Sequence, residues 1–324
     1  MTISGAVFRV VGQTMKALMR RLLVFVLAVF AVTAASAAPR AEHVFIISID
    51  GGKPAVIAQS HMPVLQQLVA EGAHTWVADT TYPSITLPSH TSMLTGVGPG
   101  VHKVLWNEWI PSNGLVTVPT IFVIAKQAGL STAMFVGKEK FRHLDLPGSL
   151  DVFDFNPANS TNVTKTMAGD LKPMKEDTVL AKYVAQDAAR YIKDKKPNLC
   201  FIHFTDTDNT GHKYGWGSPE QIQAFADVDD ALGVVVQAVR DAGIADSSVI
   251  IVSADHGGHA KTHGLSIPDD MLIPWIAWGV GVKKNFEITA PVVTYDTAAT
   301  ALWLLDLPRS SSLEGKPVES AFTQ

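Results

Sequence analysis

Apolar residues follow two alternating patterns along this chain. Short continuous apolar runs, typical of parallel strands buried on both faces, occur at residues 43–49, 132–136, 198–204, 249–253 and 273–278. Longer segments between them repeat apolar residues at helical spacing; these are residues 62–70, 120–127, 178–192, 218–241 and 296–304. Strands that alternate with helices predict an α/β fold, a three-layer sandwich with a mainly parallel central sheet.

The length and the apolar content predict a single domain. The chain has 324 residues, of which 47% are hydrophobic, and this is enough for one large domain with a buried core. The least regular segments, residues 97–118 and 139–177, are long enough to be functional loops rather than simple connections. We therefore expect one domain over residues 38–324.

Residues 1–37 have the pattern of a secretory signal peptide. Basic residues precede a short apolar run at 22–32, and Ala35-Ser36-Ala37 offers small residues for cleavage. Met15 is an alternative start. The run is shorter than the roughly 20 residues that span a membrane, so we expect cleavage, no stable membrane span, and a periplasmic or secreted protein. An uncleaved membrane anchor is the rival interpretation.

The charge distribution argues against one class of partner. The formal net charge is -4, and residues 1–37 hold four basic residues and no acid, so the rest of the chain carries a net charge of -8. Nucleic-acid binding is not expected, because it would require a basic face. The single cysteine, Cys200, lies inside an apolar run, which predicts a buried thiol and excludes an internal disulfide.

Acidic residues and histidines follow the carboxyl ends of several predicted strands. Ligands of open α/β sheets bind at this edge. The candidates are Asp50, Asp208, His212, Asp255, His256 and His263. Carboxylate and imidazole ligands together suit zinc, and two such ions about 4 Å apart can act on both oxygens of a phosphoryl transfer. The plainer alternative is that these residues cap helices and form turns.

Residues 81–90 offer the candidate nucleophiles. Ser84, Thr86 and Ser89 crowd the entry to a helix predicted at residues 89–94. Helix N-termini attract phosphate, and a nearby metal ion lowers the pKa of a hydroxyl group. Chemistry alone leaves all three open.

Other polar and aromatic residues have supporting roles in this interpretation. Asp206 is expected to orient a ligand histidine. Trp106, Trp109 and Trp216 could form an aromatic wall beside the substrate, or be buried in a loop core.

Five short motifs carry a resemblance to a known family. They are Ser48-Ile49-Asp50-Gly51, Thr86-Leu87-Pro88-Ser89-His90, Thr95-Gly96-Val97-Gly98-Pro99-Gly100-Val101-His102, Asp208-Asn209-Thr210-Gly211-His212 and Ser253-Ala254-Asp255-His256-Gly257. Each motif is weak alone, but five in this order resemble the alkaline phosphatase superfamily and, within it, the type I phosphodiesterase/nucleotide pyrophosphatase family. The resemblance implies an alkaline-phosphatase-like catalytic domain over residues 38–324.

The resemblance also implies a mechanism with two divalent metal ions, preferably zinc. One ion would be held by Asp50, Thr86, Asp255 and His256, and the other by Asp208, His212 and His263, the last chosen over His259. Thr86 would be the nucleophile that cleaves a phosphate diester or a nucleotide pyrophosphate bond through a phosphothreonine intermediate, which water then hydrolyses.

Three positions depart from the family pattern. Ser89 stands where related pyrophosphatases usually have an asparagine that donates a hydrogen bond to a phosphoryl oxygen. Lys138 and Lys140 are similar to the lysine pair with which phosphonoacetate hydrolases grip their substrate. This pair favours an alternative function, a phosphomonoesterase or phosphonate hydrolase with the same two-metal site. A sulfatase is disfavoured because residues 81–90 lack the arginine of the sulfatase signature, and a non-catalytic binding protein is disfavoured because no ligand position is lost.

Overall fold

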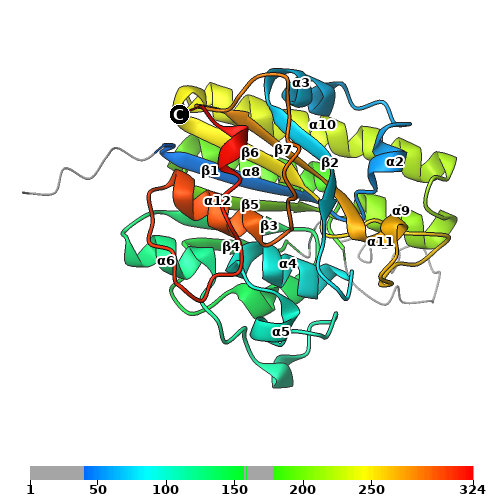
Figure 1. Cartoon of the computed structure of the whole chain (residues 1–324), viewed down its shortest axis with the longest axis horizontal. Helices are drawn as coiled ribbons and strands as arrows, with labels where there is room; N and C mark the ends of the chain where they lie inside the picture. Colours follow the sequence, from blue (N-terminus) through cyan, green and yellow to red (C-terminus); the bar gives the residue numbers. More distant parts are fainter. Residues whose placement is uncertain (1–39, 157, 159–177, 324) are drawn as a thin grey trace, which may run out of the picture. The chain divides into compact units, whose positions relative to one another are not determined.

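The computed structural model describes residues 40–156, 158 and 178–323. Within these residues eight strands form one sheet in the order β4-β3-β5-β1-β6-β7-β2-β8 (Figure 1). The strands are β1 (His43–Ile49), β2 (Ala73–Asp79), β3 (Thr132–Val136), β4 (Val152–Asp154), β5 (Leu199–Phe204), β6 (Ser248–Ser253), β7 (Leu272–Gly279) and β8 (Phe286–Glu287).

The sheet is mainly parallel. Strands β4, β3, β5, β1 and β6 pair in parallel, whereas β7 is antiparallel to both β6 and β2. All five predicted strands are present. The sequence did not predict β2, β4 and β8, which lie toward the sheet edges; β4 and β8 are very short, and β2 is only partly buried.

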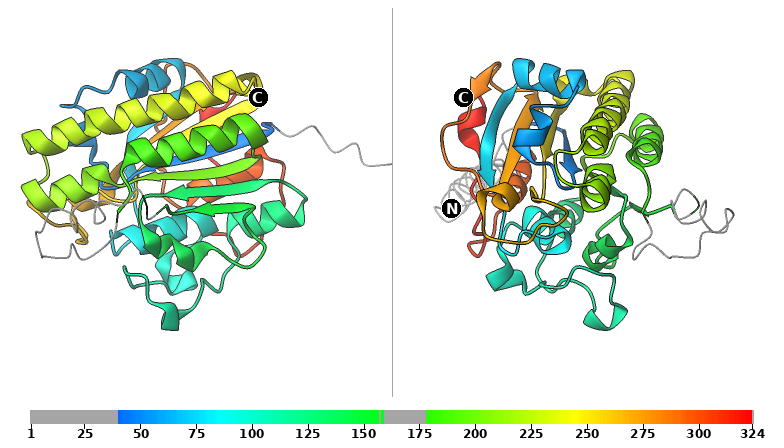
Figure 2. Two further views of the ribbon diagram at one scale, coloured as in Figure 1. Left: turned by 180° about the vertical axis from the view of Figure 1, so that it is seen from behind. Right: turned by 90° about the vertical axis from the view of Figure 1, so that its right-hand side faces the viewer.

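Helices cover both faces of the sheet. They are α2 (Pro54–Ile57), α3 (Pro63–Glu71), α4 (Thr86–Thr95), α5 (Pro99–His102), α6 (Ile121–Gln127), α8 (Ala181–Lys195), α9 (Asp206–Tyr214), α10 (Pro219–Asp241), α11 (Pro268–Met271) and α12 (Asp296–Leu304). Helices α3, α8 and α10 lie on one face, and α4 and α12 lie on the other (Figure 2). The predicted three-layer α/β fold is confirmed.

Two helices near the candidate ligands differ from the prediction. Helix α4 begins at Thr86, three residues earlier than expected, because Pro88 falls in its first turn, where a missing N–H costs nothing. Helix α9 begins directly after β5, at residues for which the sequence predicted no element. Asp208 and His212 are therefore one helical turn apart and face the same side.

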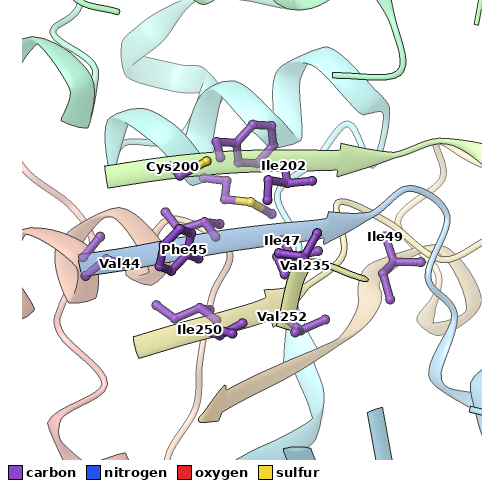
Figure 3. Close-up of a cluster of buried hydrophobic side chains, with 14 of the residues drawn as sticks. Val44, Phe45, Ile47, Ile49, Cys200, Ile202, Val235, Ile250 and Val252 are labelled. Carbon is purple, nitrogen blue, oxygen red and sulfur yellow. The ribbon is translucent and has the colours of Figure 1, made fainter. Parts of the chain in front are cut away.

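The core lies between the sheet and its helices. Figure 3 shows apolar side chains of β1, β5 and β6 packed together, with Cys200 among them. Cys200 is fully buried, and burial raises the pKa of its thiol. The prediction of an inert core thiol agrees with this placement.

Two expectations fall on residues outside the described part of the chain. They are the signal peptide over residues 1–37 and about half of the irregular segment 139–177, namely residues 157 and 159–177. Of that segment, Glu139–Leu144 forms a 3₁₀ helix and Val152–Asp154 forms β4. Among the residues that are described, none of the helices combines the length and the apolar character needed to cross a bilayer.

Asp229 of α10 should be a main anchor between two helices. Its buried carboxylate accepts hydrogen bonds from the N–H groups of Val64 and Leu65, both 2.8 Å away, in the first turn of α3. We expect Asp229→Ala to lower the free energy of unfolding by about 2 kcal/mol in urea titrations, because two helix N–H groups lose their acceptor. The exposed neighbour Asp230→Ala is the control, and an equal effect of both changes would contradict this account.

Candidate active site

Four adjacent strands deliver the candidate residues to one edge of the sheet. Asp50 follows β1, Asp208 lies in α9 after β5, Asp255 follows β6, and Lys138 lies two residues after β3. These strands are neighbours in the order β3-β5-β1-β6, and all four run in parallel. Their carboxyl ends therefore meet, as the sequence predicted.

The first cluster consists of Asp208, His212 and His263. The Nε2 atom of His212 lies 3.3 Å from Oδ1 of Asp208 and 3.1 Å from Nε2 of His263. His263 Nε2 lies 3.6 Å from the same carboxylate oxygen. Ligand atoms bound at about 2.1 Å to a tetrahedral zinc ion are about 3.4 Å apart. The three atoms thus have the spacing of a shared metal ion.

The second cluster consists of Asp50, Asp255 and His256, all fully buried. The Nε2 atom of His256 lies 3.4 Å from Oδ1 of Asp50 and 3.2 Å from Oδ2 of Asp255. Asp208 is also within reach, since atoms of Asp50, Asp208 and His256 lie within 4.8 Å of one another. The two clusters therefore adjoin at Asp208, which the sequence assigned to one site only.

The atoms that face these clusters have no hydrogen-bond partner among the described residues. They are Oδ1 of Asp50, Oδ1 of Asp208, Oδ2 of Asp255 and Nε2 of His256. A buried polar atom without a partner is costly and rare. Oxygen and nitrogen atoms gathered in this way fit a divalent cation, and their mixture suits zinc or a similar ion.

The histidines are oriented for metal binding by their second ring nitrogen. Nδ1 of His212, His256 and His263 lies 2.8–3.0 Å from a backbone carbonyl, of Lys261, Gly257 and Ser84 respectively. Nδ1 therefore carries the proton, and Nε2 presents its lone pair to the cluster. His259 instead pairs with Asp270 through a 2.7 Å hydrogen bond, so the structure brings His263, and not His259, to the cluster.

The protonation of the second cluster reflects its buried charges. Burial and the neighbouring Asp50 raise the pKa of the Asp255 carboxyl well above its usual value. Burial lowers the pKa of His256, but the carboxylates of Asp255 and Asp50 outweigh it and raise that pKa to about 9. A divalent cation bound here would favour the ionised carboxylates and the neutral imidazole.

Thr86 is the first residue of α4 and is almost fully buried. Its carbonyl accepts a 2.8 Å hydrogen bond from Nδ1 of His90, whose Nε2 lies 2.7 Å from the hydroxyl of Ser48 on β1. Burial keeps the pKa of His90 well below its usual value, so the ring is neutral. His90 thus fastens the start of α4 to the end of β1.

The other two candidate nucleophiles have structural partners. The Ser84 hydroxyl donates to the carbonyl of Leu265 at 2.9 Å. The Ser89 hydroxyl, fully buried, lies 2.9 Å from that of Thr80, which itself donates to the Asp255 carbonyl. Ser89 therefore supports the backbone of Asp255, a role that differs from the predicted contact with a phosphoryl oxygen.

The sequence did not predict that Asn107 and His203 lie at the site. The carboxamide oxygen of Asn107 accepts a 2.9 Å hydrogen bond from the N–H of Leu87, directly after Thr86. Nε2 of His203 lies 2.9 Å from Oδ2 of Asp50. One sequence feature could have indicated His203, because it is a polar residue in an otherwise apolar strand. In the sheet it lies opposite Ser48. Asn107 had no such feature, because it lies in an irregular loop.

The lysine pair is buried rather than solvated. The Lys138 ammonium lies 2.7 Å from Oδ2 of Asp50 and 2.7 Å from Oδ2 of Asp208. Burial alone would raise the pKa of Asp50, but the Lys138 ammonium and the neighbouring rings of His203 and His256 hold it well below its usual value. Lys140 is buried in the following 3₁₀ helix.

Asp206 does not orient a histidine, so that expectation was wrong. Its carboxylate accepts a 2.8 Å hydrogen bond from the N–H of Ala181, at the start of α8. Burial raises its pKa to about 6.

The tryptophans do not form one wall. Trp216 packs beside His212 and His263, with ring centroids 5.3 and 5.8 Å apart, and its indole N–H donates to the Gly51 carbonyl. Trp106 and Trp109 pack against His143 instead.

Comparisons with known proteins agree with this geometry. Residues 44–270 match the sequence model of the family described as type I phosphodiesterase / nucleotide pyrophosphatase. An uncharacterized pyrophosphatase/phosphodiesterase of Schizosaccharomyces pombe is 27% identical over 233 residues, which cover 66% of this chain and 44% of that protein. The chain thus spans less than half the length of this curated relative.

Solved structures show the same fold. A murine ectonucleotide pyrophosphatase/phosphodiesterase 5, an inactive variant in complex with AMP, superposes with a TM-score of 0.69 at 14% identity, covering 87% of this chain and 100% of that chain. A phosphonate monoester hydrolase from Silicibacter pomeroyi has a TM-score of 0.65 at 15% identity, covering 87% and 76%. The fold is therefore alkaline-phosphatase-like. Because the family's sequence model matches well over half of the chain, this protein belongs to the type I phosphodiesterase/nucleotide pyrophosphatase family.

Proposed function

We propose that this protein is an exported hydrolase that cleaves phosphate diesters or nucleotide pyrophosphate bonds with Thr86 as its nucleophile. One observation carries the proposal: four buried ligand atoms without a hydrogen-bond partner among the described residues gather near the start of α4. Such a set of atoms fits divalent cations beside an anion-attracting helix terminus. Family membership supports the reaction class.

The proposed site holds two divalent ions, preferably zinc. Asp50, Asp255 and His256, together with the Thr86 hydroxyl, would hold one ion, and Asp208, His212 and His263 would hold the other. When bound, the ions would lower the pKa of a hydroxyl group and neutralise charge on the phosphoryl oxygens.

The proposed reaction has two steps. The Thr86 hydroxyl oxygen attacks phosphorus and forms a phosphothreonine, while the bond from phosphorus to the leaving oxygen breaks and the leaving oxygen takes up the proton that the hydroxyl loses. Water then attacks phosphorus, and the Thr86 hydroxyl is regenerated with one proton of that water. The dipole of α4, whose positive end is at Thr86, favours the negative charge on the phosphoryl group.

Asn107 is the proposed donor to a phosphoryl oxygen, in place of Ser89. The Leu87 N–H binds its carboxamide oxygen, so its NH₂ group remains next to Thr86 as a donor. Ser89 has its hydroxyl engaged by Thr80.

The substrate is proposed to be a small phosphate ester outside the cytoplasm. The AMP complex of the murine relative makes a nucleotide a sensible first choice. The signal peptide predicted over residues 1–37 supports a periplasmic or secreted location. A phosphomonoesterase or phosphonate hydrolase with the same two ions is the alternative.

The first test compares kcat/KM for a bis-aryl phosphate diester with kcat/KM for the aryl monoester on zinc-loaded protein. We expect a diester preference that a chelator abolishes, because the ligand clusters need their ions. Thr86→Ala should lower kcat at least about 10³-fold, since it removes the nucleophile. It should retain the metal, since three other ligands of that ion remain. Thr95→Ala, at the far end of α4, is the matched control.

Other outcomes of this test are equally informative. A monoester preference would favour the alternative function. Turnover of neither ester, or full activity of Thr86→Ala, would refute the proposed mechanism.

Asn107→Ala should lower kcat about 10²- to 10³-fold, because it removes one donor that stabilises transition-state charge. The metal content should not change, since Asn107 contacts no candidate ligand in the described structure. Steady-state kinetics and metal analysis check both points, with the exposed Asn113→Ala as the control. An unchanged kcat would exclude Asn107 as the donor.

Ser89→Ala should affect stability rather than catalysis. Loss of the hydrogen bond with Thr80 should lower the free energy of unfolding by about 1 kcal/mol in denaturant titrations, while kcat stays close to that of the parent. A loss of kcat as large as that of Asn107→Ala would instead restore Ser89 to the role that the sequence predicted.

A further inference from the structure

Lys138 occupies a central position between the two ligand clusters. Its ammonium lies 2.7 Å from Oδ2 of Asp50 and 2.7 Å from Oδ2 of Asp208. The side chain of Lys138 is only 3% exposed, and those of the two aspartates are 0% and 4% exposed. A charged group this deeply buried between two carboxylates is part of the cluster.

The contacts of Lys138 give the two oxygens of each carboxylate different roles. In Asp50, Oδ2 binds Lys138, and Oδ1 lies 3.4 Å from Nε2 of His256. In Asp208, Oδ2 binds the same ammonium, and Oδ1 lies near the cluster histidines. Both Oδ1 atoms have no hydrogen-bond partner among the described residues. Each aspartate therefore offers one oxygen to an ion.

We propose that Lys138 is a positioning residue that holds one ligand of each ion site at the same time and so couples the affinities of the two sites. This inference rests on the proposed two-ion function. It differs from the expectation that Lys138 grips the substrate, because its ammonium lies 2.7 Å from an oxygen of each of two candidate ligands.

The backbone around Lys138 supports this position. Gly137 has no side chain, and a Cβ at that position would lie 2.9 Å from both the Thr205 side chain and the Val179 carbonyl. The N–H of Val179 binds the Gly137 carbonyl at 2.9 Å. The chain after β3 is therefore held close to the end of β5, and from there the Lys138 side chain reaches both aspartates.

The charges of the buried groups also indicate that Lys138 positions the two aspartates. Asp50 and Asp208 are buried close together, and two like charges repel strongly where water is excluded. One ammonium shared by both offsets that repulsion and fixes their orientation. A neutral side chain of similar length would leave the Asp208 carboxylate free to turn or to bind an ion through both oxygens, and would leave Oδ2 of Asp50 with His203 as its partner. Partners of this kind typically change metal affinity about 10- to 100-fold.

The test measures zinc affinity directly, without substrate. Apoprotein is titrated with zinc against a chromophoric chelator, and the dissociation constants of the first and second ion are determined. We expect Lys138→Met to weaken both constants about 10- to 100-fold. Lys140→Met, which removes an equally buried ammonium two residues away, should leave both within a few-fold of the parent.

Chemical rescue distinguishes loss of the positioning ammonium from a general loss of packing. Ethylammonium added to Lys138→Ala should restore zinc affinity, whereas ethanol of the same size should not. If Lys138→Met does not fold, as judged by circular dichroism, Lys138→Gln replaces it with the same expectation, since it keeps a donor but loses the charge.

Three outcomes overturn the inference. Weakening of one constant alone would exclude the coupling. Unchanged constants with a raised KM would return Lys138 to substrate binding. These two results would leave the proposed function intact, whereas a parent protein that binds no zinc would refute the proposed function itself.

Discussion

Compensation of buried negative charge is the constraint on which the site depends. Three carboxylates, of Asp50, Asp208 and Asp255, meet at the ends of parallel strands in a region closed to water. Charges buried in this way are stable only when they are paired. Lys138 offsets part of the charge, and the remaining unpartnered atoms face a common space that suits cations. The structure around the site serves to keep these like charges together.

The sheet supplies the alignment that this arrangement needs. Ser48 lies opposite His203 of β5 and Ser253 of β6, so the three strands end at nearly the same level. Their continuations then reach the same point from neighbouring positions. Among the described strands, antiparallel pairing is confined to the two sides of β7, which pairs with β6 and β2 away from β3 and β5. The chemistry is therefore placed by the parallel half of the sheet.

Local sequence patterns predicted the central strands and most candidate ligands. The contacts that were not predicted join residues far apart in the sequence. Continuous apolar runs located the central strands, and acids at their ends located most candidate ligands, because both depend on neighbours in sequence. The contact of His203 with Asp50 spans 153 residues, and that of Lys138 with Asp208 spans 70. No local pattern encodes such pairs. The contact of Ser89 with Thr80 was not predicted for the same reason, since Thr80 belongs to a preceding segment whose path the sequence does not fix.

A single rule describes how the six candidate ligands that are aspartates or histidines are oriented. Each binds the protein through one polar atom and leaves a second atom for the cluster. The histidines use Nδ1 and a backbone carbonyl. Asp255 uses Oδ1 and the N–H of Gly51, and the other two aspartates use Oδ2 and Lys138. Side chains fixed before an ion arrives lose little conformational freedom when it binds. The ligand geometry is thus a property of the folded chain, and the partner atoms of the ligands, as much as the ligands themselves, set the affinity for the ions.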